Sequence, residues 1–373
     1  MVSLPSEIER PVPANHNGSH QMTTVIKQGN GPLCNVPEEE YNMKNWKKAI
    51  AFVVSGAALV SFAACGSSNG DAADNGSSDS GKKTVGFVAV GPEGGFRSAN
   101  EKDIQNAFKD AGFDLIYSPT SNSDQSKQIQ AFNKFVNDEV DAIILSSTED
   151  SGWDDSLKKA AEAEIPVFTV DRNVDVKDAE AKKAIVSHIG PSNEWCGQQA
   201  AEFLNEQYPD GANGIILEGI AGLSVVKDRQ TGFDSKIASN QKVLESQSAN
   251  WSTDEAKTVT AGLLDKYKAD GIKWIWAQND EMALGAAQAV DAAGLKGQVT
   301  IIGNDGTEAA LQAVADGDLA FDIEYNPIFG KETAQAVKDY LDGKDVEANI
   351  EIDSKTFTKE EAQAALDSGE RQY

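Results

Sequence analysis

From residue 84 onward, short apolar segments alternate with longer amphipathic ones. The short, β-branched segments predict strands at 84–90, 115–117, 142–145 and 167–170. Between them, apolar positions that recur at helical spacing predict helices near 97–111, 125–137 and 153–163. Strands separated by helices of this length are typical of parallel α/β sheets, so this region predicts one such sheet.

The same alternation then repeats. Strands are predicted at 215–217, 242–246, 274–277 and 300–302, and helices near 193–207, 225–239, 252–267 and 281–293. Ser252, with Glu255 three residues later, predicts a capping box at the start of the 252–267 helix. Two successive α/β runs of similar size predict two similar lobes. Ligands of open α/β sheets bind beyond the carboxyl ends of the strands, so we expect a cleft where those ends face one another.

The residues that follow the predicted strands are unusually polar. They are Gly94, Gly95, Phe96, Arg97, Ser146, Ser147, Asp171, Arg172, 219–222, Asn279, Asp280, Asp305, Gly306 and Glu324. Loops at strand ends are polar in any case, so a single such residue carries no information. A charged or amide residue at one strand end after another favours a site for a polar ligand.

The segment that ends at Cys65 predicts export. Three lysines between residues 44 and 48 precede an uncharged stretch, 49–64, and small residues stand directly before the cysteine. This arrangement resembles the lipobox of bacterial lipoproteins, whose thiol is lipidated before cleavage, although Phe62 stands where leucine is commoner. A buried helix or a membrane span is the alternative, but the apolar run is shorter than the roughly 20 residues that a span needs.

This assignment divides the N-terminal part of the chain. Residues 1–42 fit no part of an export signal, and we interpret them as a mis-annotated extension upstream of a true start at Met43. Residues 43–64 are then the lipoprotein signal peptide. Residues 65–82 are the lipid anchor and a flexible linker of small and polar residues, and the folded part begins near residue 83.

Composition excludes several classes of function. The net charge of −26 belongs entirely to the mature part, because residues 1–64 hold five basic and five acidic residues. An acidic body argues against nucleic acid, whose phosphates need a basic surface. Beyond residue 65 the chain has one cysteine, Cys196, and one histidine, His188. A single cysteine and a single histidine offer few ligands for a metal site and few candidates for a histidine-dependent catalytic triad. We therefore expect structural roles for Cys196 and His188, with no metal and no cofactor.

Residues 84–357 resemble, segment by segment and in order, the type I sugar-binding proteins of ABC importers, the ribose- and galactofuranose-binding group. The matching segments are Asp141-Ala142-Ile143-Ile144, Ile165-Pro166-Val167 with Asp171-Arg172, 218–222 with Asp228-Arg229 and Gly232-Phe233, 277–286, and 303–307. Two further segments, 91–97 and Ser151-Gly152-Trp153, favour the fructose- and galactofuranose-type members of the group.

The resemblance implies a type I periplasmic binding protein fold, with two Rossmann-like lobes whose parallel sheets are joined by a three-stranded hinge. One lobe would comprise 83–189 plus 325–351, and the other 190–324 plus 352–373. Such a protein binds a monosaccharide in the cleft, closes over it, and delivers it to a membrane permease and, through the permease, to its ATPase subunits. We expect a monomer.

The resemblance also implies the ligand contacts. Carboxylates and amides accept hydrogen bonds from sugar hydroxyls, guanidinium groups donate to two oxygens at once, and an aromatic ring lies on a face of the sugar. The predicted contacts are Phe96, Arg97, Asp171, Arg172, Arg229, Asn279, Asp305 and Glu324, with Glu93, Ser146, Trp153 and Asn304 as further candidates.

Each of several contacts has a structural alternative. Arg172 could form a surface ion pair, Asn279 could cap a helix, and Phe96 could be core. Trp153 could pack beneath a helix start. For the other tryptophans, we expect Trp274 and Trp276 in the core, while Trp195 and Trp251 carry no assignment.

Three positions depart from the ribose-type pattern. Arg97 and Asn304 replace aromatic residues, and Glu324 replaces an amide. These changes exchange stacking surface for hydrogen bonds. They favour a ligand with more hydroxyls, such as fructose or another furanose-prone hexose, with ribose and xylose as further candidates.

The leading hypothesis is therefore an extracytoplasmic, lipid-anchored sugar receptor, most simply of a bacterium that lacks a closed periplasm. It is a binding protein and no enzyme. A receptor for galactofuranose or another sugar and a chemosensory receptor are alternatives of the same class. A glycoside hydrolase is the enzymatic alternative, because such enzymes need two carboxylates in one cleft, but no sequence signature marks such a pair.

Overall fold

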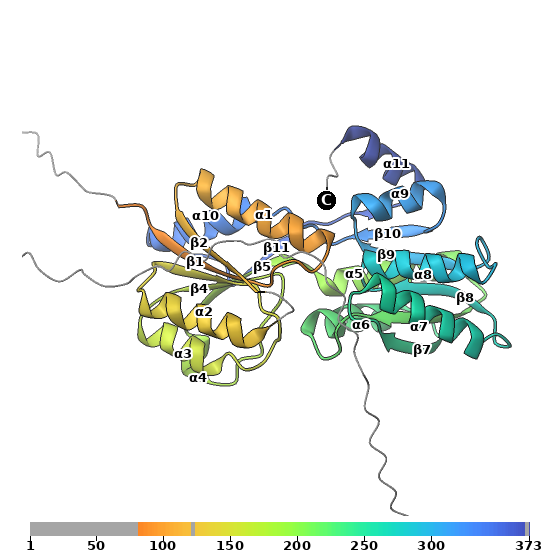
Figure 1. Cartoon of the computed structure of the whole chain (residues 1–373), viewed down its shortest axis with the longest axis horizontal. Helices are drawn as coiled ribbons and strands as arrows, with labels where there is room; N and C mark the ends of the chain where they lie inside the picture. The colour runs from red at the N-terminus through yellow and green to blue at the C-terminus, as the bar shows by residue number, and fades with distance from the viewer. Residues whose placement is uncertain (1–80, 121–123, 370–372) are drawn as a thin grey trace, which may run out of the picture. The chain divides into compact units, whose positions relative to one another are not determined.

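The computed structural model describes residues 81–120, 124–369 and 373. Its strands form two six-stranded sheets (Figure 1). The first sheet has the order β11-β5-β4-β3-β1-β2, and its neighbouring strands all pair in parallel. Its strands are β1 Thr84–Ala89, β2 Asp114–Pro119, β3 Ala142–Leu145, β4 Val167–Val170, β5 Ile185–Pro191 and β11 Asn349–Ile352.

The second sheet has the order β12-β10-β9-β8-β6-β7. Its strands are β6 Asn213–Glu218, β7 Lys242–Ser248, β8 Ile272–Ala277, β9 Thr300–Asp305, β10 Phe321–Glu324 and β12 Thr356–Phe357. All pairs are parallel except β10 with the short edge strand β12. The chain passes between the two sheets three times, after β5, after β10 and after β11.

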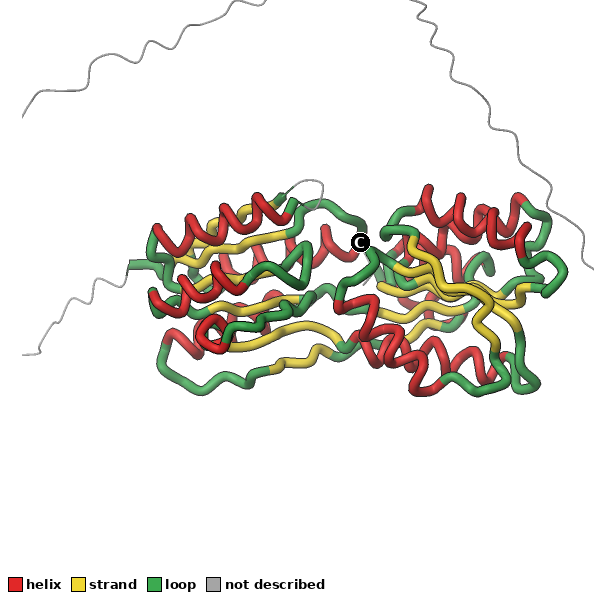
Figure 2. Tube along the Cα trace, turned by 90° about the horizontal axis from the view of Figure 1, so that it is seen from below, coloured by secondary structure: helices red, strands yellow, loops and turns green. Residues whose placement is uncertain are grey.

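Helices cover both faces of each sheet (Figures 1 and 2). The first sheet lies between one pair, α1 Gly95–Asp110 and α10 Gly330–Leu341, and a group of three, α2 Gln125–Asn137, α3 Asp154–Glu162 and α4 Ala179–Lys182. The second sheet lies between α5 Asn193–Gln207 with α6 Ser224–Lys236 and a second group, α7 Thr253–Lys266, α8 Asp280–Ala292, α9 Glu308–Asp316 and α11 Lys359–Ser368.

Alternation along the strands explains these layers. In β6, Ile215 and Leu217 pack with the α7–α8 side, whereas Ile216 between them packs with the α5–α6 side. In β8, Trp274 and Trp276 lie on the α5–α6 side and are fully buried, as the sequence predicts. Successive side chains of a strand point to opposite faces, so a strand covered on both faces is apolar throughout.

The predicted capping box at Ser252 is half correct. Ser252 Oγ accepts a hydrogen bond from the Glu255 N–H at 3.3 Å and caps α7. The Glu255 carboxylate, however, accepts from Asn250 Nδ2 at 2.7 Å, and the Ser252 N–H donates to the Ala249 carbonyl. A complete capping box forms instead at Thr358, at the start of α11.

The export signal at 43–64, the anchor Cys65 and the extension 1–42 lie outside the described residues. Within the part of the chain that the structure describes, no helix is long and apolar enough to cross a membrane.

Candidate ligand-binding site

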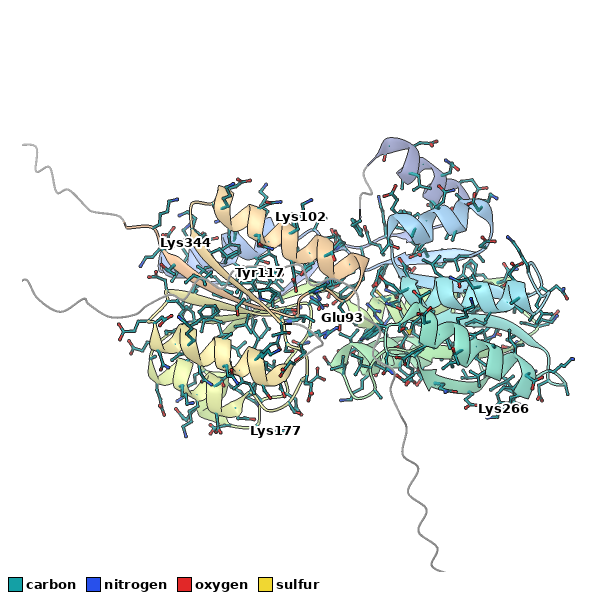
Figure 3. The ribbon with its side chains drawn as sticks, viewed as in Figure 1. Glu93, Lys102, Tyr117, Lys177, Lys266 and Lys344 are labelled. Atoms are coloured by element: carbon teal, nitrogen blue, oxygen red, sulfur yellow. The ribbon has the colours of Figure 1, made fainter. Side chains whose placement is uncertain are left out.

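A cavity of about 50 Å³ lies where the carboxyl ends of the two sheets meet, which is room for a few water molecules. Figure 3 labels Glu93 at this place. The lining residues come from both sheets and their helices: Glu93, Gly94, Phe96, Arg97, Asp171, Arg172, Val225, Arg229, Trp251, Asn279, Glu281, Asp305 and Tyr325. The structure thus brings together seven of the eight principal predicted contacts, together with Glu93.

Arg97 reaches the cavity from the first turn of α1. Gly94, with φ of 145°, directs the chain into this helix. The Arg97 guanidinium forms an ion pair with Asp171 and donates from Nη1 to Ser146 Oγ at 3.0 Å. Both members of the ion pair are at most 4% exposed. Because a buried charge is costly unless it is paired, this arrangement holds a donor and an acceptor at the cavity wall.

Asp171 and Arg172 directly follow β4. Asp171 has φ of 64°, a left-handed conformation that a residue with a side chain adopts at some cost. The Arg172 guanidinium pairs with Glu93, and Nη1 donates to the Ser147 carbonyl at 3.4 Å. Arg172 is 4% exposed, which excludes the alternative of a surface ion pair.

Arg229 lies on α6, so it reaches the cavity from a helix that covers the second sheet. Its Nε donates to Asn193 Oδ1 at 2.9 Å, Nη1 donates to the Gln278 carbonyl, and Nη2 lies 3.6 Å from Asp305 Oδ1. Asp305 is the last residue of β9 and has φ of 137°. A third pairing of arginine and carboxylate therefore forms at the cavity, opposite the first two.

Aromatic rings complete the wall. Phe96 and Tyr325 lie 5.1 Å apart between ring centroids, and the Arg229 guanidinium lies 4.9 Å from the centre of the Tyr325 ring and 5.9 Å from that of Trp251. The Tyr325 hydroxyl donates to the Asp171 carbonyl at 3.2 Å. The rings thus present flat surfaces among the charged groups, the combination that a sugar ring with its edge hydroxyls requires.

Trp251 is the most informative lining residue without a sequence assignment. It has φ of 61°, and its Nε1 has no hydrogen-bond partner among the described residues. A Cβ added to Gly219 would lie 2.0 Å from the Trp251 ring, so this glycine provides the space for the indole. The signal in the sequence was the position of Trp251 between a strand and a helix. The predicted strand ended at residue 246, however, whereas β7 continues to Ser248, so Trp251 did not stand near the predicted strand end.

Asn279 has two roles at once. Its Oδ1 accepts from the Met282 N–H at 3.0 Å and caps α8, as the structural alternative requires. It also lines the cavity, where Nδ2 donates to the Glu281 carboxylate at 2.7 Å. Helix capping and a place at the site are therefore compatible at this position.

Two lining carboxyls have opposite electrostatic environments. Burial by itself would raise the pKa of Asp171, but Arg97 and Arg172 hold that pKa below its ordinary value. Burial raises the pKa of Asp305 well above its ordinary value; Arg229 only partly opposes this, and the neighbouring carboxyls of Asp280 and Glu281 add to it. The Asp171 carboxylate therefore stays ionised and acts as a hydrogen-bond acceptor, whereas the Asp305 carboxyl keeps its proton to a higher pH than an ordinary aspartate does.

Four predicted contacts do not line the cavity. Ser146 supports Arg97 from behind, and Asn304 is fully buried next to Asp305. The Glu324 carboxylate accepts from the Lys355 N–H at 2.9 Å, where the chain passes between the sheets. Trp153 is fully buried against Phe132 and donates to the Glu149 carbonyl, so its packing role applies.

Cys196 and His188 lie away from the lining. Cys196 is fully buried with a free thiol whose pKa burial raises to about 12, which agrees with the predicted packing role. His188 Nδ1 contacts Thr169 Oγ1 at 3.0 Å, and burial lowers its pKa to about 4. Among residues 81–120, 124–369 and 373, no group of His, Cys, Asp and Glu could hold a metal ion.

The fold and the sequence define the class of this chain. The model of the periplasmic binding protein domain family matches residues 85–345. The chain therefore belongs to this family, and it is a binding protein rather than an enzyme.

Individual relatives refine the class. The fructose import binding protein FruE of Bifidobacterium longum (strain NCC 2705) is 81% identical over 331 residues, which cover 89% of this chain and 100% of that protein. The galactofuranose-binding protein YtfQ of Escherichia coli (strain K12) is 33% identical, covering 69% of this chain and 81% of that protein. One similar solved structure is the periplasmic binding protein component of the arabinose ABC transporter from Shewanella sp. ANA-3, bound to α- and β-L-arabinofuranose. It has a TM-score of 0.73 and 33% identity, and covers 77% of this chain and 95% of that one.

Proposed function

We propose that this protein captures D-fructose, in a furanose ring form, for an ABC importer. The observation that carries the proposal is the cavity itself, in which three arginine–carboxylate pairs and the rings of Phe96, Trp251 and Tyr325 converge from both sheets. The 81% identity to a fructose import binding protein over that protein's full length supports the choice of sugar.

The chemistry of the lining suits a neutral, hydroxyl-rich ring. Sugar hydroxyls accept from the guanidinium groups of Arg97, Arg172 and Arg229 and donate to the carboxylates that now pair with them. A sugar that satisfies both partners of a buried pair keeps every charged group hydrogen-bonded. A sugar that leaves one unpaired loses about 1–3 kcal/mol for that group, so the selectivity is steep.

The furanose form is supported by two kinds of observation. Relatives at 33% identity are named for galactofuranose or were solved with arabinofuranose. In this chain, Arg97 enlarges the hydrogen-bonding capacity of the wall beside Phe96.

Membership of the periplasmic binding protein family supports a proposal for delivery and localisation. We propose that the closed, sugar-loaded form docks on a permease that its ATPase subunits drive. We further propose that Cys65 carries a lipid anchor outside the cytoplasmic membrane, that 65–82 is a tether, and that the protein acts as a monomer built of the lobes 83–189 plus 325–351 and 190–324 plus 352–373.

Isothermal titration calorimetry of the purified protein against D-fructose, D-ribose, D-xylose, D-galactose and D-glucose tests the proposal. D-Fructose is expected to bind most tightly, and a protein that binds none of the five sugars would refute the sugar assignment. The carbon NMR spectrum of bound [2-¹³C]fructose distinguishes furanose from pyranose, and a pyranose signal would refute the ring form alone.

A further inference from the structure

A glutamine behind the cavity uses its whole hydrogen-bonding capacity. Gln128, on α2, is fully buried and does not line the cavity. Its Nε2 donates to the carbonyls of Ala89 at 3.1 Å and Ser146 at 2.8 Å. Its Oε1 accepts from the Thr148 N–H at 2.8 Å and from Thr148 Oγ1 at 3.0 Å. An amide side chain has two donors and two acceptor positions, so none is left over.

These bonds fix the loop 146–148. Ala89 is the last residue of β1, and the loop directly follows β3, the parallel neighbour of β1. A buried loop has no regular ladder of backbone hydrogen bonds and needs partners from elsewhere. Gln128 supplies them at both ends of the loop, at the Ser146 carbonyl and at the Thr148 N–H, and ties the loop to the end of β1.

The same loop supports two arginines of the cavity wall. Ser146 Oγ accepts from Arg97 Nη1 at 3.0 Å, and the Ser147 carbonyl accepts from Arg172 Nη1 at 3.4 Å. The two arginines come from different elements, one from α1 and one from the end of β4. The loop 146–148 is therefore an uncharged contact that both guanidinium groups share.

We propose that Gln128 is a positioning residue of the site, and that it sets the places of Arg97 and Arg172 by holding the loop 146–148. A guanidinium donates in fixed directions, and a hydrogen bond weakens steeply as its angle departs from linear. A displaced loop would therefore misalign both arginines at once. For sugar affinity, this inference rests on the proposed function.

Gln128→Glu is the most conservative test. A carboxyl group has at most one proton to donate, so the carbonyl of Ala89 or that of Ser146 loses its partner and faces an oxygen. The shape of the side chain is kept, and Oε1 still accepts from Thr148. The substitution thus disturbs the loop without opening a cavity.

Gln241 provides a matched control. It is also buried, its Oε1 accepts from the Ala212 N–H at 3.0 Å, and its Nε2 donates to the carbonyls of Tyr208 at 2.6 Å and Leu204 at 3.4 Å. Ala212 directly precedes β6, so these bonds lie at the amino end of the second sheet, away from the cavity. Gln241→Glu makes the same exchange without contact to either arginine.

The first measurement needs no sugar. The arginines of the chain are Arg10, Arg97, Arg172, Arg229 and Arg371, so ¹⁵N-arginine labelling gives few side-chain Nε–H signals in an NMR spectrum. Arginine-to-lysine variants assign the signals of the three lining arginines by their loss. In Gln128→Glu we expect the signals of Arg97 and Arg172 to shift more than that of Arg229. In Gln241→Glu we expect all three at their parent positions.

The second measurement is calorimetry with D-fructose, which gives the dissociation constant and the stoichiometry separately. A substitution that only destabilises the fold lowers the fraction of competent protein, and therefore the stoichiometry. For Gln128→Glu we expect the parent stoichiometry with binding weaker by about tenfold, the effect of about one hydrogen bond. For Gln241→Glu we expect a lower thermal midpoint with the parent dissociation constant.

Unchanged Arg97 and Arg172 signals in Gln128→Glu overturn the proposal, and so does a parent dissociation constant in that variant. If the parent binds no fructose, the sugar assignment falls, while the sugar-free spectra still decide whether Gln128 positions the two arginines. If Gln128→Glu does not fold, Thr148→Val decides instead. It removes only the bond from Thr148 Oγ1 and should shift the same two signals by less.

Discussion

Two buried carboxyl groups meet beneath the candidate site. Asp280 and Asp322 are both fully buried, and a Cβ added to Gly303 would lie 2.7 Å from an oxygen of each. Their other oxygens accept from the backbone, Asp280 from the Thr307 N–H at 2.8 Å and Asp322 from the Gly306 N–H at 3.2 Å. The pair therefore holds the turn that directly follows β9.

The two facing oxygens require a shared proton. Asp280 Oδ1 and Asp322 Oδ2 have no partner other than each other among the described residues, and two ionised carboxylates cannot face one another in a buried site. Burial, and then the charge of Asp280, raises the pKa of Asp322 well above its ordinary value. A raised native pKa contributes stability that is fully present below the unfolded pKa, near 4, and is lost as pH rises through the native value.

Asp322→Asn should remove this loss. An asparagine keeps the shape, its oxygen still accepts from Gly306, and its amide donates permanently to Asp280 in place of the titrating proton. The parent loses roughly 1.4 kcal/mol per pH unit above pH 4 through this carboxyl until the native pKa is reached. The free energy of unfolding of the variant, relative to the parent, should rise by that amount per unit over the same window.

Urea unfolding of parent and variant at pH 4.5, 5.5, 6.5 and 7.5 measures the difference. A difference that does not change with pH would refute the shared proton. Asp322→Ala serves as the control, because it removes the acceptor for Gly306 and should be destabilising throughout. Fructose affinity should be unchanged in Asp322→Asn, since the turn after β9 keeps both of its hydrogen bonds.

Three further predictions test the site and the packing behind it. Arg172→Ala leaves the half-buried Glu93 carboxylate with only the more distant Arg97 Nε, at 3.8 Å, and should weaken fructose binding by about 2–5 kcal/mol in calorimetry, with circular dichroism unchanged; near-parent affinity would remove Arg172 from the site. Gly219→Val should displace Trp251 and weaken binding as Trp251→Ala does, and full affinity in both variants would show that the indole is not a sugar contact. Gly197→Ala places a Cβ 1.9 Å from the backbone of α6, so it should cost about 1–3 kcal/mol of stability and lower the thermal midpoint; an unchanged midpoint would contradict this close approach of α5 and α6.

The apolar pattern predicted most of the fold because buried parallel strands are apolar throughout. The strands β3 and β4 and the helices α2 and α5 have the predicted bounds. Four strands, β5, β10, β11 and β12, have no bounds among the predicted strands. Of these, β11 and β12 are short edge strands, and β11 has no buried residue. β11 pairs with β5, which lies more than 100 residues away along the chain, and no local pattern predicts such a pairing.

The strand-end rule predicted residues that line the cavity wherever a strand ends directly at it. Asp171, Arg172 and Asp305 were found in this way, because the carboxyl ends of parallel strands share one edge of a sheet. Glu324 satisfies the same rule, but its carboxylate contacts Lys355. Trp251 lies in a connection with a left-handed backbone, and Tyr325 lies where the chain passes from the second sheet to the first. The apolar pattern of the strands predicts neither feature.

The sequence by itself determined the two α/β repeats and the set of polar groups at their strand ends, because burial and periodicity are local properties of a strand or helix. Only the tertiary structure decided which carboxylate pairs with which arginine, and that Asp150 and Glu281 each cap a helix of the opposite sheet. Pairing and capping depend on distances between segments separated by 74 to 186 residues along the chain, and those distances are set by the packing of the whole molecule.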